Sequence, residues 1–291
     1  KQKDEVIIEL LEAAVPIPIT VKLDAIKVIR RDGQEEQIEE EFSSVIKLIK
    51  EYYEIFGFKE YWFRLSKWDQ KNNKKYINEP EKWKHTEEII RKVLKKLKVK
   101  FTEAEGEAAF YGPKVDVQFK TVTGREETMS TIQLDFAAKE RFDLHYQDKN
   151  GEMNKEVYVI HRAPLSVHER FIAMLIEHYA GKFPLWLAPT QIRILSLTDR
   201  NKKFVEGLKK KFKEAEFRVD IDVRSESMSK KVKDAQMMKI PVTITVGDKE
   251  QKSETLAIRT LDGKLKFGVK AKNFIEAIAS NIQKRKLNIS F

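Results

Sequence analysis

The sequence predicts an α+β domain built on an antiparallel sheet, followed by a smaller α/β domain. A length of 291 residues allows two domains at roughly 100 to 200 residues each. In the first part, strand patterns precede a closing helix, whereas strands and helices alternate in the second part. The pattern changes at residues 187–190 (LAPT), so we expect domains at 1–187 and 188–291.

The predicted helices and strands of the first domain lie between residues 34 and 179. Apolar residues recur at spacings of three and four over 34–56, which indicates an amphipathic helix. A strand over 61–65 and a helix over 80–97 follow, with Pro80 tolerated in the first helical turn. Polar and apolar residues alternate over 114–120, which indicates a strand with one polar face. The strand over 114–120 is predicted to form an antiparallel meander with strands over 129–136, 142–147 and 157–160. A helix over 167–179 follows the meander.

The second domain follows a different pattern. Strands are predicted over residues 192–197, 218–223 and 242–246, and helices over 201–215 and 227–238. This alternation is typical of right-handed crossovers and a parallel sheet. A hairpin over 256–269 and a helix over 271–285 complete a compact α/β domain.

Composition and charge exclude several classes of protein. Because the chain has no cysteine, it supplies neither disulfides nor thiolate metal ligands. No apolar run approaches the ~18 to 20 residues of a membrane span, and residues 1–20 carry acids that a signal peptide would lack. We therefore expect a cytoplasmic protein with no membrane partner. A net charge of +10 favours a polyanionic partner such as nucleic acid, with lysine-rich solvated helix faces as the alternative.

Two segments have chemistry of their own. Residues 106–114 (GEAAFYGPK) are typical of a turn leading into a strand. Residues 161–164 (HRAP) end a predicted strand, and 166–171 (SVHERF) begin a helix, which places a His and two Arg where a helix N-terminus can meet an anion. Structural ion pairs are the alternative for these residues.

Six short motifs together resemble the threonyl-tRNA synthetases. They occur in that family's order and spacing: AFYGPK (109–114), TIQLDF (131–136), VIHRAPL (159–165), HERF (168–171), FPLWLAP (183–189) and VGDKE (246–250). The resemblance covers roughly residues 35–286. It implies a partial class II catalytic domain, followed by an α/β anticodon-binding domain.

The resemblance assigns roles only where residues match. Arg170 corresponds to the arginine of class II motif 3, a fixed guanidinium that holds the triphosphate of ATP. Tyr111, Lys114 and Gln133 match positions that line the aminoacyl-adenylate pocket, and Lys114 is counted with Arg170 as catalytic. ATP and Mg²⁺ are the implied cofactors.

The family also binds a zinc ion through Cys, His and His. A Lewis-acidic zinc that takes the amino and hydroxyl groups of threonine rejects valine, which an apolar pocket alone separates only about a hundredfold. His161 matches one ligand, but this chain has no Cys, and Ile26 stands at the best match to the second His. In the same alignment Asp24 keeps an acid at a threonine-contacting position. Zinc binding is therefore an open expectation.

In the second domain the resemblance points to anticodon recognition. Glu250 and Arg259 match positions that contact anticodon bases, where a Glu accepts from a base amino group and an Arg donates to base acceptors. Lys239 stands where an arginine is usual, and Ser225 replaces an asparagine. A surface ion pair between Glu250 and Arg259 is the alternative.

Three hypotheses follow from the resemblance. Class II motifs 1 and 2 would precede the matched region, where only about thirty residues are present. The chain is thus a threonine–tRNA ligase or a fragment of one, a non-catalytic paralogue that binds tRNA or protein, or an engineered fragment. The expected partners are threonine-specific tRNA, and ATP and threonine if the pocket is complete; a homodimer stays open.

Overall fold

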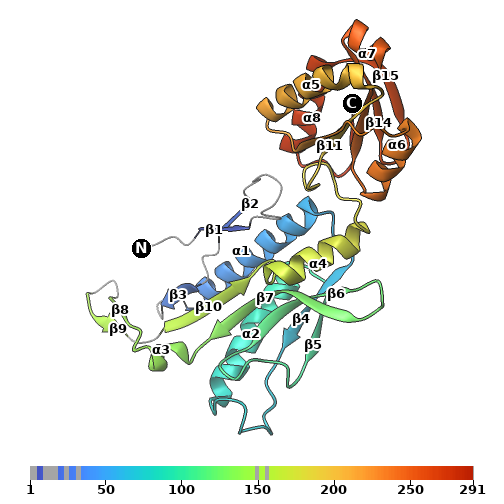
Figure 1. The fold of residues 1–291 in the computed structure, drawn as a ribbon. Helices are drawn as coiled ribbons and strands as arrows, with labels where there is room; N and C mark the ends of the chain where they lie inside the picture. Colours follow the sequence, from blue (N-terminus) through green and yellow to red (C-terminus); the bar gives the residue numbers. More distant parts are fainter. Residues whose placement is uncertain are drawn as a thin grey trace. The chain divides into compact units, whose positions relative to one another are not determined.

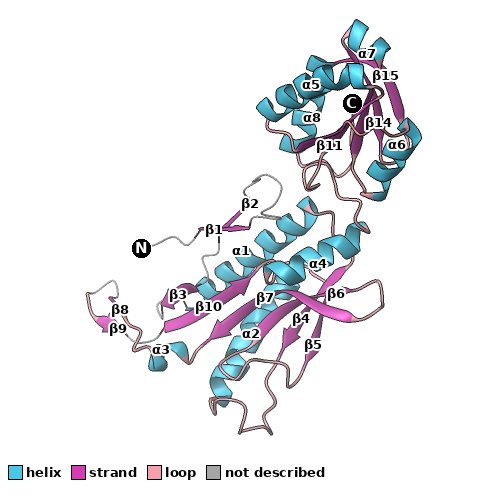
Figure 2. Cartoon of the chain, viewed as in Figure 1, coloured by secondary structure: helices cyan, strands magenta, loops and turns pink. Residues whose placement is uncertain are grey.

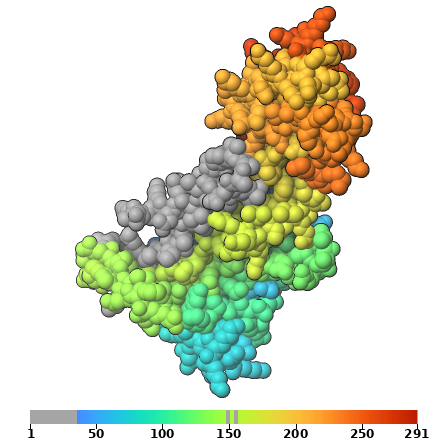
Figure 3. Space-filling view, viewed as in Figure 1, coloured from blue at the N-terminus to red at the C-terminus, as the bar shows by residue number. Residues whose placement is uncertain are grey.

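The structure is a computed structural model and describes residues 5–8, 19–22, 26–30, 34–147, 151–154 and 157–290. The chain divides into two compact units, and the division falls between Met174 and Leu175. Figure 1 labels the elements, and Figure 3 shows the surface, cyan to yellow-green for the first unit and yellow to red for the second. The domain limits 1–187 and 188–291 stay a prediction.

The described strands of the first unit form one large sheet and two small ones. The large sheet has the order β3-β10-β7-β6-β4-β5, while β1 pairs with β2 and β8 with β9. Every pair in the large sheet is antiparallel except β4 with β5, which is parallel, so the predicted antiparallel sheet is mixed at one edge. The elements are β1 (Glu5–Ile8), β2 (Ile19–Lys22), β3 (Ile26–Arg30), α1 (Gln34–Ile55), β4 (Tyr61–Ser66), α2 (Pro80–Lys96), β5 (Phe101–Ala104), β6 (Lys114–Lys120), β7 (Glu126–Asp135), α3 (Ala138–Arg141), β8 (Tyr146–Gln147), β9 (Met153–Asn154), β10 (Val157–Ala163) and α4 (His168–Tyr179).

Alternation along the strands separates an apolar face from a polar face. Val115, Ile132 and Ile160 lie in the core, whereas their neighbours Lys114, Gln133 and His161 are only partly buried. Figure 2 shows the strands of this unit in magenta with the long helices beside them in cyan. Helices α1 and α2 lie against each other, and each contacts the sheet. Because each helix buries an apolar stripe, the core forms between these helices and the sheet.

The segment after β7 differs from the prediction. We expected a strand over residues 142–147 that turns into β10. The strand β8 covers Tyr146–Gln147 alone and, among the described strands, pairs with β9 and not with β10, and the short helix α3 precedes it. Asp135 explains the helix, because its Oδ1 accepts the N–H groups of Ala137 at 2.9 Å and Ala138 at 2.8 Å. These local side-chain to backbone hydrogen bonds offer the backbone an alternative to the sheet.

The second unit contains a sheet of order β12-β11-β13-β14-β15. β11 pairs in parallel with β12 and β13, and β14 and β15 add antiparallel strands, as the alternation and the hairpin pattern predicted. The elements are β11 (Ile192–Ser196), η1 (Asp199–Asn201), α5 (Lys202–Glu214), β12 (Val219–Asp222), α6 (Met228–Met237), β13 (Val242–Val246), α7 (Asp248–Ser253), β14 (Thr255–Thr260), β15 (Leu265–Lys270) and α8 (Ala271–Gln283). α5 and α8 pack on one face of this sheet around Phe212 and Phe274, and Figure 1 shows α6 on the other side.

The segment before β11 is fixed to the second unit by buried polar groups. Arg218 is 5% exposed and donates Nε to Ala188 O and Nη2 to Trp186 O, both at 2.8 Å. Gln191 Nε2 donates to Leu185 O at 2.9 Å. Burial lowers the pKa of Arg218 to about 10. The FPLWLAP segment therefore forms part of the fold of the second unit.

None of the helices in the described ranges is both long and apolar enough to span a bilayer.

Candidate functional site

A row of polar residues crosses the large sheet of the first unit. Strand register pairs Lys114 of β6 with Gln133 of β7, and Gln133 with His161 of β10. Directly paired residues lie on the same face of a sheet with Cβ atoms roughly 5 Å apart. The structure thus brings together Lys114 and Gln133, which the resemblance assigned to the adenylate pocket, and His161, which it matched to a zinc ligand. On the far side of His161, its register partner is Ile26 of β3.

Tyr111 completes this group from the loop before β6. Its hydroxyl donates to Gln133 Oε1 at 3.1 Å, and its ring lies edge-on to that of His161 with centroids 6.0 Å apart. Burial and the nearby charge of Asp135 raise the pKa of Tyr111, so the hydroxyl keeps its proton at neutral pH.

Gly112 lets the Tyr111 loop lie against β7. A Cβ at this position would be 1.9 Å from Leu134 O, far inside contact distance. The loop is joined to the strand by the bonds Leu134 N to Pro113 O at 3.0 Å and Phe136 N to Tyr111 O at 3.2 Å. The close backbone approach, rather than an unusual φ, is the reason for a glycine here.

The Asp116 carboxylate accepts four side-chain hydrogen bonds next to this group. Its Oδ2 accepts from Lys114 Nζ at 2.8 Å, from Ser66 Oγ at 2.9 Å and from Arg64 Nη2 at 3.1 Å. Its Oδ1 accepts from Thr131 Oγ1 at 2.8 Å. The carboxylate is fully buried, whereas the Lys114 side chain keeps 22% of its surface exposed. The buried Asp116 therefore fixes the ammonium group of Lys114, and part of the Lys114 side chain stays accessible to solvent.

The balance of charge at Asp116 favours its ionised form. Burial alone would raise the pKa of this carboxyl, but the hydrogen bond and charge of Lys114, together with the hydroxyls of Thr131 and Ser66, lower the pKa below its usual value. Lys114 and Arg64 thus share a buried anion.

His161 is hydrogen-bonded to a carboxylate. Its Nε2 lies 3.1 Å from Asp135 Oδ2, and the other oxygen of Asp135 accepts the N–H groups of Ala137 and Ala138 at the start of α3. This bond fixes the orientation of the imidazole ring.

The donor set at His161 does not match the Cys, His, His set of the resemblance. The chain has no Cys, Ile26 is the register partner of His161, and within the described ranges no three His, Cys, Asp or Glu residues are grouped so that they could hold a metal ion. Asp24, the other residue expected in this pocket, lies outside the described residues. We therefore derive no chemical step through a metal.

Arg170 lies in the first turn of α4 with an exposed side chain. In the described part of the chain no contact joins it to the polar row, so the predicted ATP contact stays a prediction. Ser166, just before this helix, has φ of +60°. That left-handed conformation favours glycine.

In the second unit, the alternative of an ion pair between Glu250 and Arg259 is not seen among the described residues. Glu250 caps α7 instead, because its Oε2 accepts from Gly247 N at 3.0 Å. Arg259 lies half-buried on β14 and has no salt-bridge partner within the described ranges. Ser225 and Lys239 flank α6 and are exposed. Their roles in base recognition stay predictions.

A second cross-strand row leads to Arg259. Register pairs Arg193 of β11 with Thr243 of β13, and Thr243 with Arg259. Arg193 forms a two-pronged ion pair with Asp220, with Nε to Oδ1 at 2.8 Å and Nη2 to Oδ2 at 2.5 Å. Of the two guanidinium groups on this face, that of Arg193 is paired with Asp220, and that of Arg259 has no salt-bridge partner within the described ranges.

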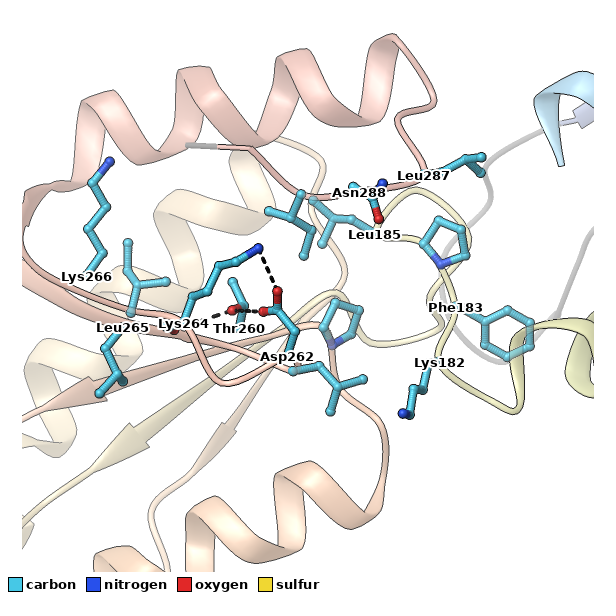
Figure 4. A pocket seen from close by; sticks show the side chains of 15 residues that line it. Lys182, Phe183, Leu185, Thr260, Asp262, Lys264, Leu265, Lys266, Leu287 and Asn288 are labelled. Atoms are coloured by element: carbon cyan, nitrogen blue, oxygen red, sulfur yellow. Dashed lines mark hydrogen bonds and ion pairs between the residues drawn. The ribbon is translucent and has the colours of Figure 1, made fainter. Parts of the chain in front are cut away.

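A cavity of about 650 Å³ lies beside the hairpin of β14 and β15. Figure 4 shows Lys182 and Phe183 on one side of it and Leu265 and Lys266 on the other. Between them, Asp262 accepts from Thr260 and forms an ion pair with Lys264 at 2.7 Å.

Sequence reasoning missed Arg64, Ser66, Asp116 and Asp135 as members of the site. The alternation of residues 114–120 did place Asp116 on the polar face with Lys114. Strand register was the absent information, because Arg64 and Asp116 are 52 residues apart in the sequence.

Two family models match the chain. The model described as "tRNA synthetase class II core domain (G, H, P, S and T)" matches residues 26–179, and "Anticodon binding domain" matches residues 191–281.

Curated relatives are similar over most of the chain. The threonine–tRNA ligase of Clostridium botulinum is 41% identical over 248 residues, which are 85% of this chain and 38% of the relative. That of Streptococcus pneumoniae is 44% identical over 250 residues, again 85% and 38%. The chain thus spans less than two fifths of the length of these relatives.

Solved structures agree with the fold. The RNA-binding domain of threonyl-tRNA synthetase from Cryptosporidium parvum Iowa II superposes with a TM-score of 0.77 at 26% identity, covering 88% of this chain and 62% of that one. A putative threonyl-tRNA synthetase from Aeropyrum pernix gives 0.71 at 25% identity, covering 91% and 64%.

Proposed function

We propose, on the premise that the chain belongs to the class II tRNA synthetase family of the G, H, P, S and T group, that it serves the charging of threonine tRNA. Its first unit supplies one wall of the threonyl-adenylate pocket, and its second unit binds the anticodon region of tRNA. The observation that carries the proposal is the Tyr111, Lys114, Gln133 and His161 group on one open face of the sheet.

The chemistry of this face suits an aminoacyl adenylate. Lys114 has one donor bonded to Asp116, which leaves two ammonium hydrogens for a phosphate oxygen. The Tyr111 and Gln133 pair offers both donors and acceptors to polar groups of the ligand. ATP supplies the activated phosphate in the family's reaction, and the exposed Arg170 is the proposed partner of its triphosphate.

The second unit is proposed as the RNA-binding part. Arg259 has an open guanidinium on a sheet face, which suits base acceptors of an unpaired anticodon. Glu250, Lys239 and Ser225 are proposed as further contacts. Specificity for threonine tRNA and a cytoplasmic location belong to the same proposal.

Binding of a non-hydrolysable threonyl-adenylate analogue to the 291-residue chain, measured by calorimetry, tests the pocket. We expect saturable binding that Lys114→Ala weakens by roughly ten- to a hundredfold, the equivalent of a lost hydrogen bond to a charged group. Lys120→Ala, at the exposed end of the same strand, is the matched control and should leave affinity unchanged. Failure of the unmodified chain to bind the analogue would refute the proposal.

A second candidate is a tRNA-binding protein that does not activate threonine. The register of Ile26 with His161 favours it, because that position cannot supply a metal ligand. Threonine-dependent ATP–pyrophosphate exchange separates the two functions. Turnover by the purified chain supports the ligase, and tRNA binding without turnover supports the second candidate.

A further inference from the structure

The last strand of the second unit exposes an aromatic side chain. Phe267 of β15 is 70% exposed and has no ring contact within the described residues. β15 lies at the edge of the sheet, with β14 as its one neighbour among the described strands. Large exposed aromatics on a sheet edge are unfavourable in an isolated protein, because they invite unspecific association. We therefore ask which ligand would cover Phe267.

A β-bulge sets the position of Phe267. Ile258 pairs with Lys266, but Leu256 pairs with Val269, so β15 carries one extra residue opposite β14. Gly268 within this bulge has φ of +69°. Bulges with a left-handed glycine re-aim the neighbouring side chain and interrupt pairing to a further strand. The edge is thus built to project a side chain rather than to accept another strand.

Two lysines lie close to this aromatic residue in the sequence. Lys264 and Lys266 precede Phe267, and Leu265 between them is the register partner of Arg259. Lys264 is neutralised by Asp262, whereas Lys266 is exposed and has no salt-bridge partner within the described ranges. An aromatic side chain near an unpaired lysine is an arrangement that binds unpaired nucleotides, with the base on the ring and a phosphate on the lysine.

Lysines on edge strands also serve to prevent aggregation. That role explains Lys264 and Lys266 but not a neighbouring Phe267 left open to solvent. Leu265 and Lys266 line the cavity of about 650 Å³ beside the hairpin, whereas Phe267 lies outside its lining.

We propose that β15 is an RNA-contacting strand, in which Phe267 stacks on an unpaired base of the bound tRNA loop and Lys266, on the other side of this edge strand, contacts a phosphate of the same loop. The inference rests on the proposed tRNA binding of the second unit. It adds to that proposal a stacking position and a backbone contact that the resemblance to the family does not assign.

The test measures binding of an anticodon stem-loop RNA to the full 291-residue chain by fluorescence anisotropy at several salt concentrations. Phe267→Ala should weaken binding about 5- to 100-fold and leave the salt dependence unchanged, since stacking involves no counterion release. Lys266→Gln should reduce the slope of log affinity against log salt by about 0.7 to 1. Phe267→Trp should retain affinity, because a larger aromatic ring still stacks.

Phe142→Ala is the matched control, because Phe142 of the first unit is 72% exposed and equally aromatic. It should leave RNA affinity unchanged.

If the unmodified chain does not bind the stem-loop, the proposed tRNA binding itself fails. If it binds and Phe267→Ala binds equally well, only the stacking inference is overturned. A change of oligomeric state with Phe267→Ala, measured by light scattering, together with unchanged RNA affinity, would assign Phe267 to a protein interface and also overturn the inference.

Discussion

The cations at Asp116 in the first unit differ from Arg259 and Lys266 of the second unit in how their charge is balanced. In the first, Lys114 and Arg64 share the buried Asp116, so the cations are fixed before any ligand arrives. In the second, Arg259 and Lys266 have no salt-bridge partner in the described part of the chain. A pre-arranged cation suits a small ligand that must be oriented, while open cations suit a polyanion that supplies its own charge.

Removing Asp116 is expected to have the largest effect on this comparison. Asp116→Ala leaves Lys114 and Arg64 without their buried anion, and breaking a buried ion pair from one side costs about 3 to 5 kcal/mol of unfolding free energy. Urea denaturation measures it. The control is Asp199→Ala, which removes an exposed ion pair with Lys202 and should cost less than about 1 kcal/mol. Equal losses would show that burial of Asp116 has no energetic role.

Gly112, whose backbone lies against that of Leu134, can be compared with Gly207, which has free space around it. Gly112→Ala forces a Cβ against Leu134 O and should destabilise the first unit by about 1 to 3 kcal/mol. Gly207→Ala in α5 meets no atom within 4 Å and should stabilise by up to about 1 kcal/mol, as alanine favours helix. Thermal unfolding of both variants measures these changes in stability. A neutral Gly112→Ala variant would contradict the close backbone approach at Gly112.

Ser166 tests the backbone before α4. Because its φ is +60°, Ser166→Gly should raise the unfolding free energy by about 1 kcal/mol, less the entropy that glycine adds to the unfolded chain. Ser166→Val should lower it, since a β-branched residue fits this conformation poorly. Calorimetric melting of the two variants measures both signs, and a destabilised glycine variant would contradict the assignment.

Glu103 supplies a smaller, pH-dependent effect at the sheet edge. A two-pronged hydrogen bond from Arg91, with Lys67 nearby, lowers the pKa of Glu103 to about 2 against desolvation. Its stabilising effect is therefore present above about pH 4.5 and is lost as the pH falls towards 2. Arg91→Met should cost about 0.5 to 1 kcal/mol at pH 7 and almost nothing at pH 2. A cost independent of pH would assign the loss to packing instead.

Local patterns in the sequence predicted most elements because periodicity is a local signal. The alternation over 114–120 gave β6 and its polar face, and the strand–helix alternation gave the parallel part of the second sheet. The Asp116 network was out of reach, because Arg64, Ser66 and Thr131 come from other strands whose register is set by tertiary packing. The helix α3 was missed because it has one turn and depends on two hydrogen bonds from its first N–H groups to the Asp135 side chain.

The site was predicted in part for the same reason. Motif resemblance named Tyr111, Lys114 and Gln133, which the fold brings together. It could not show that Glu250 caps α7 rather than pairing with Arg259, nor that a bulge exposes Phe267. Both depend on contacts that no single segment encodes.

The most direct test of the two-site account is a crossed binding experiment on one chain with two ligands, the threonyl-adenylate analogue and the anticodon stem-loop RNA. The account predicts that Lys114→Ala loses affinity for the analogue and keeps it for the RNA, and that Arg259→Ala does the reverse. If either variant weakened both ligands equally, or if neither variant changed its own ligand, the assignment of the two faces to two ligands would be contradicted.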